Sequence, residues 1–432
     1  MGKLFPRLIL LYIPFLLLAG CHPTASDTPA SSQTNHSATP SATLSTITQQ
    51  PSVPESATNA PDAIETPGDS WAAIPEPTLS TDLSPTTTDA ASGEGYIVVY
   101  SDTSRAESSI AALMDAHPGL EAETYTLSSL DIYLRLREDL ESGSTLPDVY
   151  LVGDGPRTQS LLDEGILESV VPTDLEAVLP TEVQQPLLAH HWSAVTLVAS
   201  RVPTDALAID NWWDLTRTEL RGRVVLPDPI IDERTLYWLT TVAQHGDEMA
   251  TAYQLEFGQA IVLDTDCPNA GWQWIKDLLR NEPQLVVNDA QVAATVGDLN
   301  AAGFVVGLCG SEQWEKVARG EISLDSLTEV QPTAGLRWWS YLALVAGSQR
   351  RTAAEEAIRW LMGDAAGGGG YAVWYKAGFY PARSDVPDPP GAPSGTELAA
   401  HLWELDIAYL NENLQAVRDF VTPYMGHPVG GH

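Results

Sequence analysis

The chain has 432 residues, of which 44% are apolar, and it carries 57 acidic against 22 basic side chains, for a formal charge of −35. This length exceeds that of one small domain, and the apolar fraction is sufficient for a buried core. So acidic a surface repels the phosphates of nucleic acids, which excludes them as partners. Three cysteines are too few for a disulfide scaffold.

The N-terminus has the order of a secretory signal, with basic residues first and apolar residues next. Lys3 and Arg7 precede an apolar run from Leu8 to Leu18, which is shorter than the ~20 residues of a membrane-spanning helix. The run ends in Leu18-Ala19-Gly20-Cys21, which resembles a bacterial lipobox. The resemblance implies a cleaved signal peptide of residues 1–20 and acylation of Cys21. We therefore expect a lipid-anchored protein on the outer face of the cytoplasmic membrane, in an extracellular or periplasmic location.

The segment from residue 21 to residue 93 consists mainly of Ser, Thr, Pro and Ala with scattered acids. It has almost no large apolar side chains, so it cannot bury enough surface to offset the entropy lost on ordering. We predict a disordered tether between the anchor and a folded part that begins near residue 94.

Strands and helices alternate from Tyr96 onward. Tyr96–Tyr100 is an apolar run typical of a strand buried on both faces. A helical pattern follows it until Pro118, and further strands are expected at Leu120–Thr126 and Asp148–Val152 around a helix at Leu130–Glu141. This order is typical of a parallel α/β sheet.

The alternation continues to the end of the chain. Strands are expected at Ala194–Ala199, Arg223–Leu226, Gly303–Leu308 and Leu342–Val345. Helices are expected at Asp232–Gln244, Gly271–Asn281, Asp289–Asn300, Ala353–Met362 and Glu397–Phe420. An α/β unit of this length is consistent with two lobes.

Six segments occur in the order found in bacterial extracellular solute-binding proteins of the ferric-iron, polyamine and phosphonate branch. They are Ile97–Ser101, Leu146–Leu151, Leu161–Leu167, Trp212–Pro229, Asn288–Gly307 and Gly378–Val386. The chain resembles that family, and the resemblance implies an α/β, two-lobed periplasmic-binding-protein type II fold with a ligand cleft between the lobes. It places one lobe at about 95–193 plus 333–432 and the other at about 194–332. It also implies an ABC permease in the membrane as partner and no cofactor.

Ligands of open α/β sheets bind beyond the carboxyl ends of the strands. That rule selects candidates that follow four strands, and the resemblance adds two tryptophans near the inferred hinge. Each has a plain structural alternative as an N-cap, a turn residue or core packing. The candidates for ligand binding are Ser101, Asp102, Thr103, Asp154, Trp192, Asp228, Cys309, Ser311, Glu312 and Trp338.

No metal site is predicted. The ferric-binding branch places adjacent tyrosines where this chain has Glu312-Gln313, and three scattered carboxylates do not make a metal site. His190 and His191 are adjacent, so on a strand they are expected to point to opposite faces and to have a structural role. Cys267 and Cys309 are either free or joined in a disulfide, which an oxidising location permits.

The function that follows is capture of a small molecule or ion by lobe closure, by a monomer that delivers it to the permease of an ABC importer. An enzyme is not expected, because the sequence has no nucleophile elbow, zinc-binding helix, phosphate loop or dinucleotide motif. The alternatives are a receptor that presents its ligand to a membrane sensor, and a degenerate lipoprotein that transports nothing. The ligand's charge stays open, because acidic candidates favour a cation whereas helix N-termini favour an anion.

Overall fold

The computed structural model describes residues 95–201, 208–298 and 303–425. The predicted signal peptide of residues 1–20, the acylated Cys21 and the tether of residues 21–93 lie outside these residues. Within the described part, no helix has the length and apolar character needed to cross a membrane.

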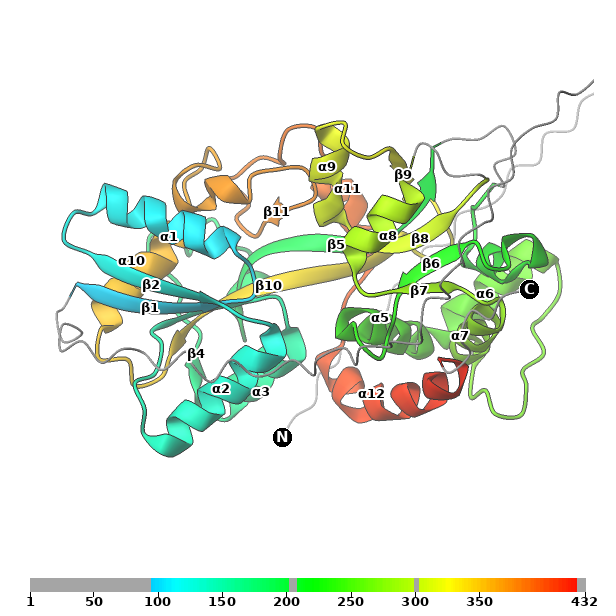
Figure 1. Cartoon of the computed structure of the whole chain (residues 1–432), viewed down its shortest axis with the longest axis horizontal. Helices are drawn as coiled ribbons and strands as arrows, with labels where there is room; N and C mark the ends of the chain where they lie inside the picture. Colours follow the sequence, from blue (N-terminus) through cyan, green and yellow to red (C-terminus); the bar gives the residue numbers. More distant parts are fainter. Residues whose placement is uncertain (1–94, 202–207, 299–302, 426–432) are drawn as a thin grey trace, which may run out of the picture. The chain divides into compact units, whose positions relative to one another are not determined.

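Strands and helices alternate as the sequence predicts (Figure 1). The strands are β1 Tyr96–Ser101, β2 Glu121–Thr126, β3 Val149–Val152, β4 Leu167–Glu168, β5 Leu188–Ser200, β6 Val224–Pro227, β7 Gln284–Val286, β8 Val306–Gly310, β9 Leu324–Ser326, β10 Gly335–Val345, β11 Tyr380–Pro381 and β12 Leu402–Trp403. The α-helices are α1 Arg105–Ala116, α2 Ser129–Ser142, α3 Gly155–Asp163, α4 Thr181–Gln184, α5 Glu233–Gln244, α6 Gly246–Phe257, α7 Ala270–Arg280, α8 Asp289–Val296, α9 Trp314–Ala318, α10 Arg351–Leu361, α11 Gly395–Ala399 and α12 Ile407–Val421. The 3-10 helices are η1 Trp212–Thr216, η2 Thr218–Leu220, η3 Ser311–Gln313, η4 Gly369–Val373 and η5 Thr422–Tyr424.

The main path of the sheet has the order β2-β1-β3-β10-β5-β8-β6-β7. Strands β2, β1 and β3 are parallel to one another, and so are β8, β6 and β7. Between these two groups lie the long strands β5 and β10, which pair antiparallel. We call the part built on β1, β2 and β3 the first lobe and the part built on β6, β7 and β8 the second lobe.

Strands β5 and β10 belong to both lobes, as Figure 1 shows where they cross from one part of the sheet to the other. In β10, residues Tyr341–Leu344 pair with β3, and Gly335–Leu342 pair with β5. In β5, residues Val195–Ala199 pair with β8. The two lobes are therefore joined through backbone hydrogen bonds of continuous strands.

The first lobe buries apolar side chains from both faces of its sheet. Ile97 and Val99 of β1 pack with Ile110 and Leu113 of α1, and all four are almost completely buried. Asp148, just before β3, is also buried, because its carboxylate accepts a hydrogen bond from the Val98 amide at 2.8 Å and pairs with Arg350 at 3.1 Å. The Pro-Asp-Val segment of the family resemblance thus has a structural role here.

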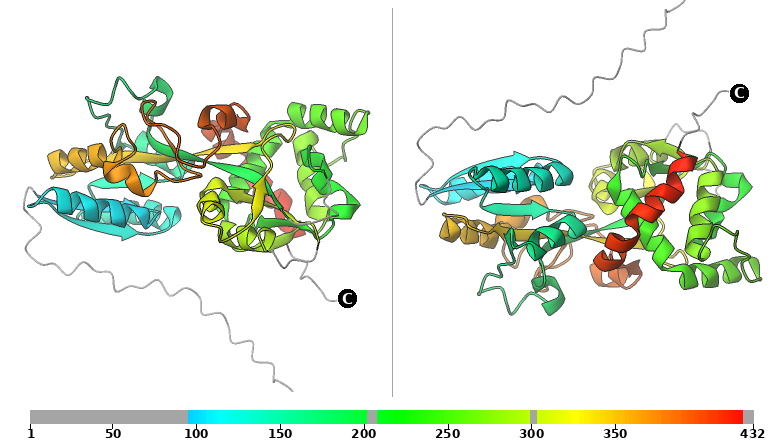
Figure 2. Two further views of the ribbon diagram at one scale, coloured as in Figure 1. Left: turned by 90° about the horizontal axis from the view of Figure 1, so that it is seen from above. Right: turned by 90° about the horizontal axis from the view of Figure 1, so that it is seen from below.

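The second lobe is built around a cluster of tryptophans. Trp212, Trp238 and Trp274 are fully buried, and the Trp274 indole donates a hydrogen bond to the Trp212 carbonyl at 2.8 Å. Val417 and Val421 of the C-terminal helix α12 pack into the same cluster. The right-hand view of Figure 2 shows this helix, in red, beside the green helices of the second lobe.

Candidate functional site

A cleft of about 860 Å³ lies where the two lobes face each other. Its walls include the segments that follow β1 and β3 in the first lobe and the starts of α5 and α9 in the second lobe. Parts of β5 and β10 also line it. The volume lies in the range of small-molecule binding sites. Because carboxyl ends of parallel strands from both lobes meet here, the cleft is at the position where open α/β sheets bind ligands.

Five of the ten predicted ligand-binding residues line this cleft. They are Asp102, Thr103, Asp154, Glu312 and Trp338. The strand-end rule therefore identifies one wall in each lobe, since the first three belong to the first lobe and Glu312 follows β8.

Three of the other five predicted residues are held in the protein interior, and none of these lines the cleft. The Ser101 hydroxyl is buried and accepts from the Thr103 amide, while the Ser311 hydroxyl accepts from the Ala194 amide at 2.9 Å. Cys309 is fully buried in the core of the second lobe. In this structure these three side chains are buried instead of lining the cleft, because side chains at strand ends alternate between cleft-facing and core-facing positions.

Trp192 and Asp228 also lie away from the cleft. Trp192 stacks on Tyr380 with ring centroids 4.2 Å apart, and the Arg337 guanidinium lies over the Trp192 ring, 5.0 Å from its centroid. The Asp228 carboxylate accepts from the Ile230 amide at 2.8 Å, which closes a turn. In this structure, both residues make the contacts expected of core packing and of a turn.

Asp102 is one of the first-lobe residues that line the cleft. Its carboxylate accepts from the Gly153 amide at 2.8 Å. Desolvation by the surrounding walls raises the Asp102 pKa to about 6, and the nearby Asp154 adds to the rise, while the Gly153 hydrogen bond opposes it. A Cβ atom at Gly153 would lie 3.0 Å from the Trp338 indole nitrogen, so glycine permits this close packing.

The second-lobe wall is organised by Arg234 near the start of α5. Its guanidinium pairs with Glu312 at 3.0 Å and with Asp289 at 3.2 Å, and it lies 5.2 Å from the ring centroid of Trp338. Tyr237, one turn further along α5, stacks on the same tryptophan. Burial raises the pKa of Asp289 to about 6 against the opposing effect of Arg234. This wall therefore presents the Trp338 ring beside the Arg234 guanidinium, whose positive charge is balanced by the Glu312 and Asp289 carboxylates.

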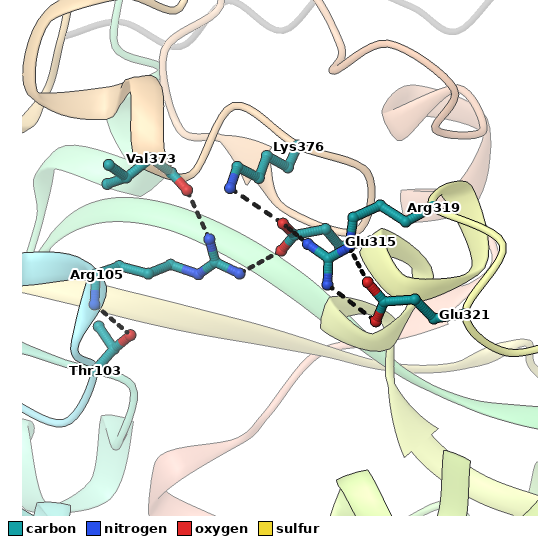
Figure 3. A network of polar contacts seen from close by, with 7 residues as sticks. All are labelled: Thr103, Arg105, Glu315, Arg319, Glu321, Val373 and Lys376. Carbon is teal, nitrogen blue, oxygen red and sulfur yellow. Dashed lines mark hydrogen bonds and ion pairs between the residues drawn. The ribbon is translucent and has the colours of Figure 1, made fainter. Parts of the chain in front are cut away.

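Ion pairs connect the two lobes on either side of the cleft. Arg105 of α1 reaches Glu315 of α9 at 2.5 Å, in the network drawn in Figure 3. Arg157 of α3 reaches Glu233 of α5 at 2.5 Å and also pairs with Asp154. These contacts fix the separation of the two walls in this conformation.

His190 and His191 do not point to opposite faces, contrary to the sequence-based expectation. Ser340 of β10 pairs with His191, but Tyr341 pairs with Ala189, so His190 is an extra residue in an irregularity of the ladder. Such a bulge breaks the alternation of side chains. The two imidazoles are in contact, with 2.8 Å between their Nδ1 atoms, and His191 lines the cleft. Burial lowers the pKa of His190 to about 4 and that of His191 well below its usual value.

The disulfide alternative for Cys267 and Cys309 is wrong in this structure, because both thiols are free and buried. They lie in different apolar clusters, Cys267 with the buried tryptophans and Cys309 on β8 with Val292 and Val296 of α8. Burial raises the pKa of both thiols.

One group of carboxylates among the described residues is close enough to hold a cation, and it lies away from the cleft. It consists of Asp210, Asp214 and Glu256. The guanidinium of Arg217 pairs with Asp214 at 2.7 Å and with Glu256, so an internal cation already compensates this group.

Sequence reasoning missed several residues that line the cleft, notably Arg105, His191, Arg234 and Trp374. The two arginines follow β1 and β6 closely, and the strand-end rule would have included them had it been extended into the first turn of each helix. His191 was missed because the bulge that turns it toward the cleft leaves no signal in the sequence.

No protein-family model and no curated protein matches the chain. Solved structures do match its fold. Iron-bound HitA from Pseudomonas aeruginosa has 16% identity and a TM-score of 0.58, over 75% of this chain and 99% of that one. The apo ferric ion-binding protein A of Pasteurella haemolytica has 13% identity and a TM-score of 0.57, over 78% of this chain and all of that one.

The periplasmic binding protein AfuA from Actinobacillus pleuropneumoniae, with fructose-6-phosphate bound, has 14% identity and a TM-score of 0.58, over 78% of this chain and all of that one. These likenesses confirm the predicted α/β, two-lobed periplasmic-binding-protein fold. Identities this low show the fold alone.

Proposed function

We propose that the protein is the solute-binding component of an ABC importer, which captures a small ligand between its lobes and delivers it to a membrane permease. The observation that carries the proposal is the 860 Å³ cleft, walled by strand ends of both lobes of a periplasmic-binding-protein fold. In this proposal the chain is anchored by lipid at Cys21 and spaced from the membrane by residues 21–93. The similarity to periplasmic proteins supports a place outside the cytoplasmic membrane.

The ligand enters and leaves by movement of the lobes about β5 and β10. Closure of two lobes about connecting strands is a common response to ligand binding. We propose the lobe boundaries implied by the sequence resemblance, near 193/194 and 332/333, except that α12 is assigned to the second lobe, because Val417 and Val421 pack into its tryptophan cluster. The pairs Arg105–Glu315 and Arg157–Glu233 support the approach of the walls, since each joins one lobe to the other.

The cleft walls support a polar solute. Carboxylates, arginines and hydroxyls line most of the site, while Trp338 and Phe379 supply aromatic surface. Among the described residues, the cleft does not bring three histidine, cysteine or carboxylate ligand atoms within reach of one ion.

A thermal-shift screen of the mature chain, produced with Cys21→Ser to keep it in solution, tests the binding function. The panels are sugars, polyols, polyamines, amino acids, thiamine, phosphonates and Fe(III). A ligand at about 1,000 times its dissociation constant stabilises the folded state by about 4 kcal/mol, which moves the midpoint by several degrees. A saturable rise is expected for one chemical class. A flat result on protein shown by mass spectrometry to be free of retained ligand would refute solute capture.

Lipid anchoring has a separate test. The full chain expressed in a bacterial host is expected in the membrane fraction, and the Cys21→Ser variant in the soluble exported fraction. Equal distribution of the two chains would refute the anchor while leaving the binding function intact.

A further inference from the structure

Asp102 differs from the other carboxylates that line the cleft. Among the described residues, no cationic side chain forms an ion pair with it. Four of the other five lining carboxylates are paired with an arginine, in the pairs Asp154–Arg157, Glu233–Arg157, Glu312–Arg234 and Glu315–Arg105. The fifth, Asp232, caps α5 by accepting from the Thr235 amide at 3.1 Å. The cleft therefore has one carboxylate, Asp102, that neither an ion pair nor a helix cap satisfies.

The structural contact of Asp102 does not require its charge. The carboxylate accepts a hydrogen bond from the Gly153 amide at 2.8 Å, and the amide oxygen of an asparagine would accept the same hydrogen. An ionised carboxylate that loses water without gaining a cation raises the free energy of the protein. The Asp102 pKa is accordingly raised to about 6, chiefly by desolvation. A positively charged group of the solute would remove this cost.

Two further polar groups converge with this carboxylate beside Gly153, just beyond the end of β3. The position that a Cβ atom would take at Gly153 marks the point where they meet. It lies 3.0 Å from the Trp338 indole nitrogen, 3.3 Å from Ser340 Oγ and 3.5 Å from Asp102 Oδ2. All four residues line the cleft. Within the described part of the chain, the Trp338 N–H and the Ser340 hydroxyl have no hydrogen-bond partner, and neither is sealed from solvent.

The three atoms need different partners. An ionised carboxylate only accepts hydrogen bonds, an indole N–H only donates, and a hydroxyl does both. A protonated amine supplies hydrogens for the Asp102 carboxylate and for Ser340 Oγ, but it has no lone pair for the Trp338 N–H. An oxygen atom close to the amine in the same solute supplies that lone pair. An anionic group is disfavoured here, because it would face the negative charge of Asp102.

We propose that Asp102, Ser340 and Trp338 bind a protonated amine with an oxygen atom beside it, so that the captured solute is an amino alcohol or an amino sugar. This inference rests on the proposed function, because it names the ligand class of the same cleft. The ammonium group donates to Asp102 and Ser340, and the neighbouring oxygen accepts from Trp338. A neutral polyol would leave the charge of Asp102 without a counter-charge, and an amine without oxygen would leave the Trp338 N–H unpaired.

The affinity for such a solute should depend on pH through Asp102. A cation binds the ionised carboxylate, so affinity should rise with pH through the Asp102 pKa of about 6, by about tenfold between pH 5 and 7, and then level off. Of the charged groups that face Asp102, Asp154 raises its pKa and Arg234 lowers it. Arg234 keeps its charge over this range, and Asp154 is paired with Arg157. Tyr150 of β3 stays neutral, because burial raises its pKa.

Isothermal titration calorimetry of the mature Cys21→Ser chain tests the site with ethanolamine and glucosamine as probes. Propylamine lacks the oxygen of ethanolamine, and ethylene glycol and glucose lack the amines. Saturable binding is expected for at least one of the two probes, about tenfold or more tighter than for its matched compounds. Asp102→Asn, which keeps the acceptor for Gly153, should weaken that binding about tenfold or more and abolish its pH dependence, and Ser340→Ala should weaken it about threefold. Asp115→Asn, which removes a charge at an exposed position, is the matched control.

The outcomes separate this inference from the proposed function. Saturable binding of an amine-free solute, with no response to either probe, overturns the amine site and leaves solute capture standing. Probe binding that Asp102→Asn leaves unchanged has the same meaning, provided circular dichroism shows that the variant folds. Propylamine binding as tight as that of ethanolamine would overturn the role of Trp338. Silence from these compounds and from the whole thermal-shift panel counts against both the site and solute capture.

Discussion

The ion-pair network that joins the lobes can be tested by removing its members one at a time. Glu315 accepts from Arg105 at 2.5 Å, from Arg319 at 2.6 Å and from Lys376 at 3.1 Å (Figure 3). Arg105 also donates to the Val373 carbonyl at 2.7 Å. The substitutions are Arg105→Met, which keeps the apolar stem, and Glu315→Gln, which keeps the shape of the side chain.

The two substitutions should differ in cost. In Arg105→Met the Glu315 carboxylate keeps two cations, and the lost guanidinium was 25% exposed, so the expected loss of unfolding free energy is about 1–2 kcal/mol. In Glu315→Gln three cations face one another around a side chain that was 13% exposed, so about 2–3 kcal/mol is expected. The double variant should cost about 1 kcal/mol less than the sum, because the two side chains contact each other.

Urea unfolding of the ligand-free mature chain measures the stability of the wild type, the two single variants and the double variant. Arg201→Met, in an ion pair with Asp325 whose partners are both about half exposed, is the matched control and should change stability by less than about 0.5 kcal/mol. Equal costs for Arg105→Met and Glu315→Gln, or strict additivity in the double variant, would refute the reasoning.

The same network predicts a pH dependence. Burial alone would raise the Glu315 pKa, but the hydrogen bonds from Arg105 and Lys376 lower it below its usual 4.5. A carboxyl with a lowered folded-state pKa stabilises the protein above the unfolded-state pKa and loses that contribution as the pH falls through the folded-state value. The stability difference between wild type and Glu315→Gln should therefore shrink below about pH 4.5.

Three further predictions concern the cleft and its support. Asp102→Ala and Glu312→Ala should each weaken ligand binding about tenfold while the circular dichroism spectrum stays that of the wild type. The control variant, Asp115→Ala at an exposed position, should bind the ligand as tightly as the wild type. Wild-type affinity in both cleft variants would show that the ligand does not bind in this cleft. The Asp102 pKa is raised to about 6, so the unfolding free energy of the wild type should fall relative to that of Asp102→Asn as the pH rises from about 4 to 6. Urea unfolding measures this difference, and a difference that does not change with pH would contradict the raised pKa. Gly378→Ala should greatly lower the stability of the folded state, because a Cβ atom at this position would lie 1.8 Å from the Ser311 carbonyl oxygen and the backbone φ is +94°. A thermal midpoint within about a degree of the wild type would contradict this packing.

Much of the fold was predictable because its strands are continuous apolar runs. The run Tyr96–Tyr100 lies within β1, and Gly303–Leu308 predicted the strand observed at Val306–Gly310. The expected helix Glu397–Phe420 is instead divided into α11, β12 and α12. Leu402 and Trp403 leave the helical path because they pair with β10, and this long-range pairing is absent from local periodicity.

The sequence predicted which strand ends lie at the cleft, because that depends on chain direction, but it did not predict which of their side chains line it. Asp102, Asp154 and Glu312 follow strands, and strand ends meet at the cleft whatever the details of packing. Ser311 also follows β8 and Cys309 lies near its end, but both side chains enter the interior. Only the packing of neighbouring segments, such as the Gly378 carbonyl that accepts from Ser311 at 2.6 Å, decides which way each points.

The position of β10 between β3 and β5 also governs when the protein can fold. Leu342 pairs with Leu151, so the sheet of the first lobe lacks an inner strand until most of the chain has left the ribosome. Pairings between residues so distant in sequence form slowly, because a long loop must close before they bring any stability. A nascent chain with the predicted secretory leader would therefore stay unfolded long enough to be threaded through a translocation pore.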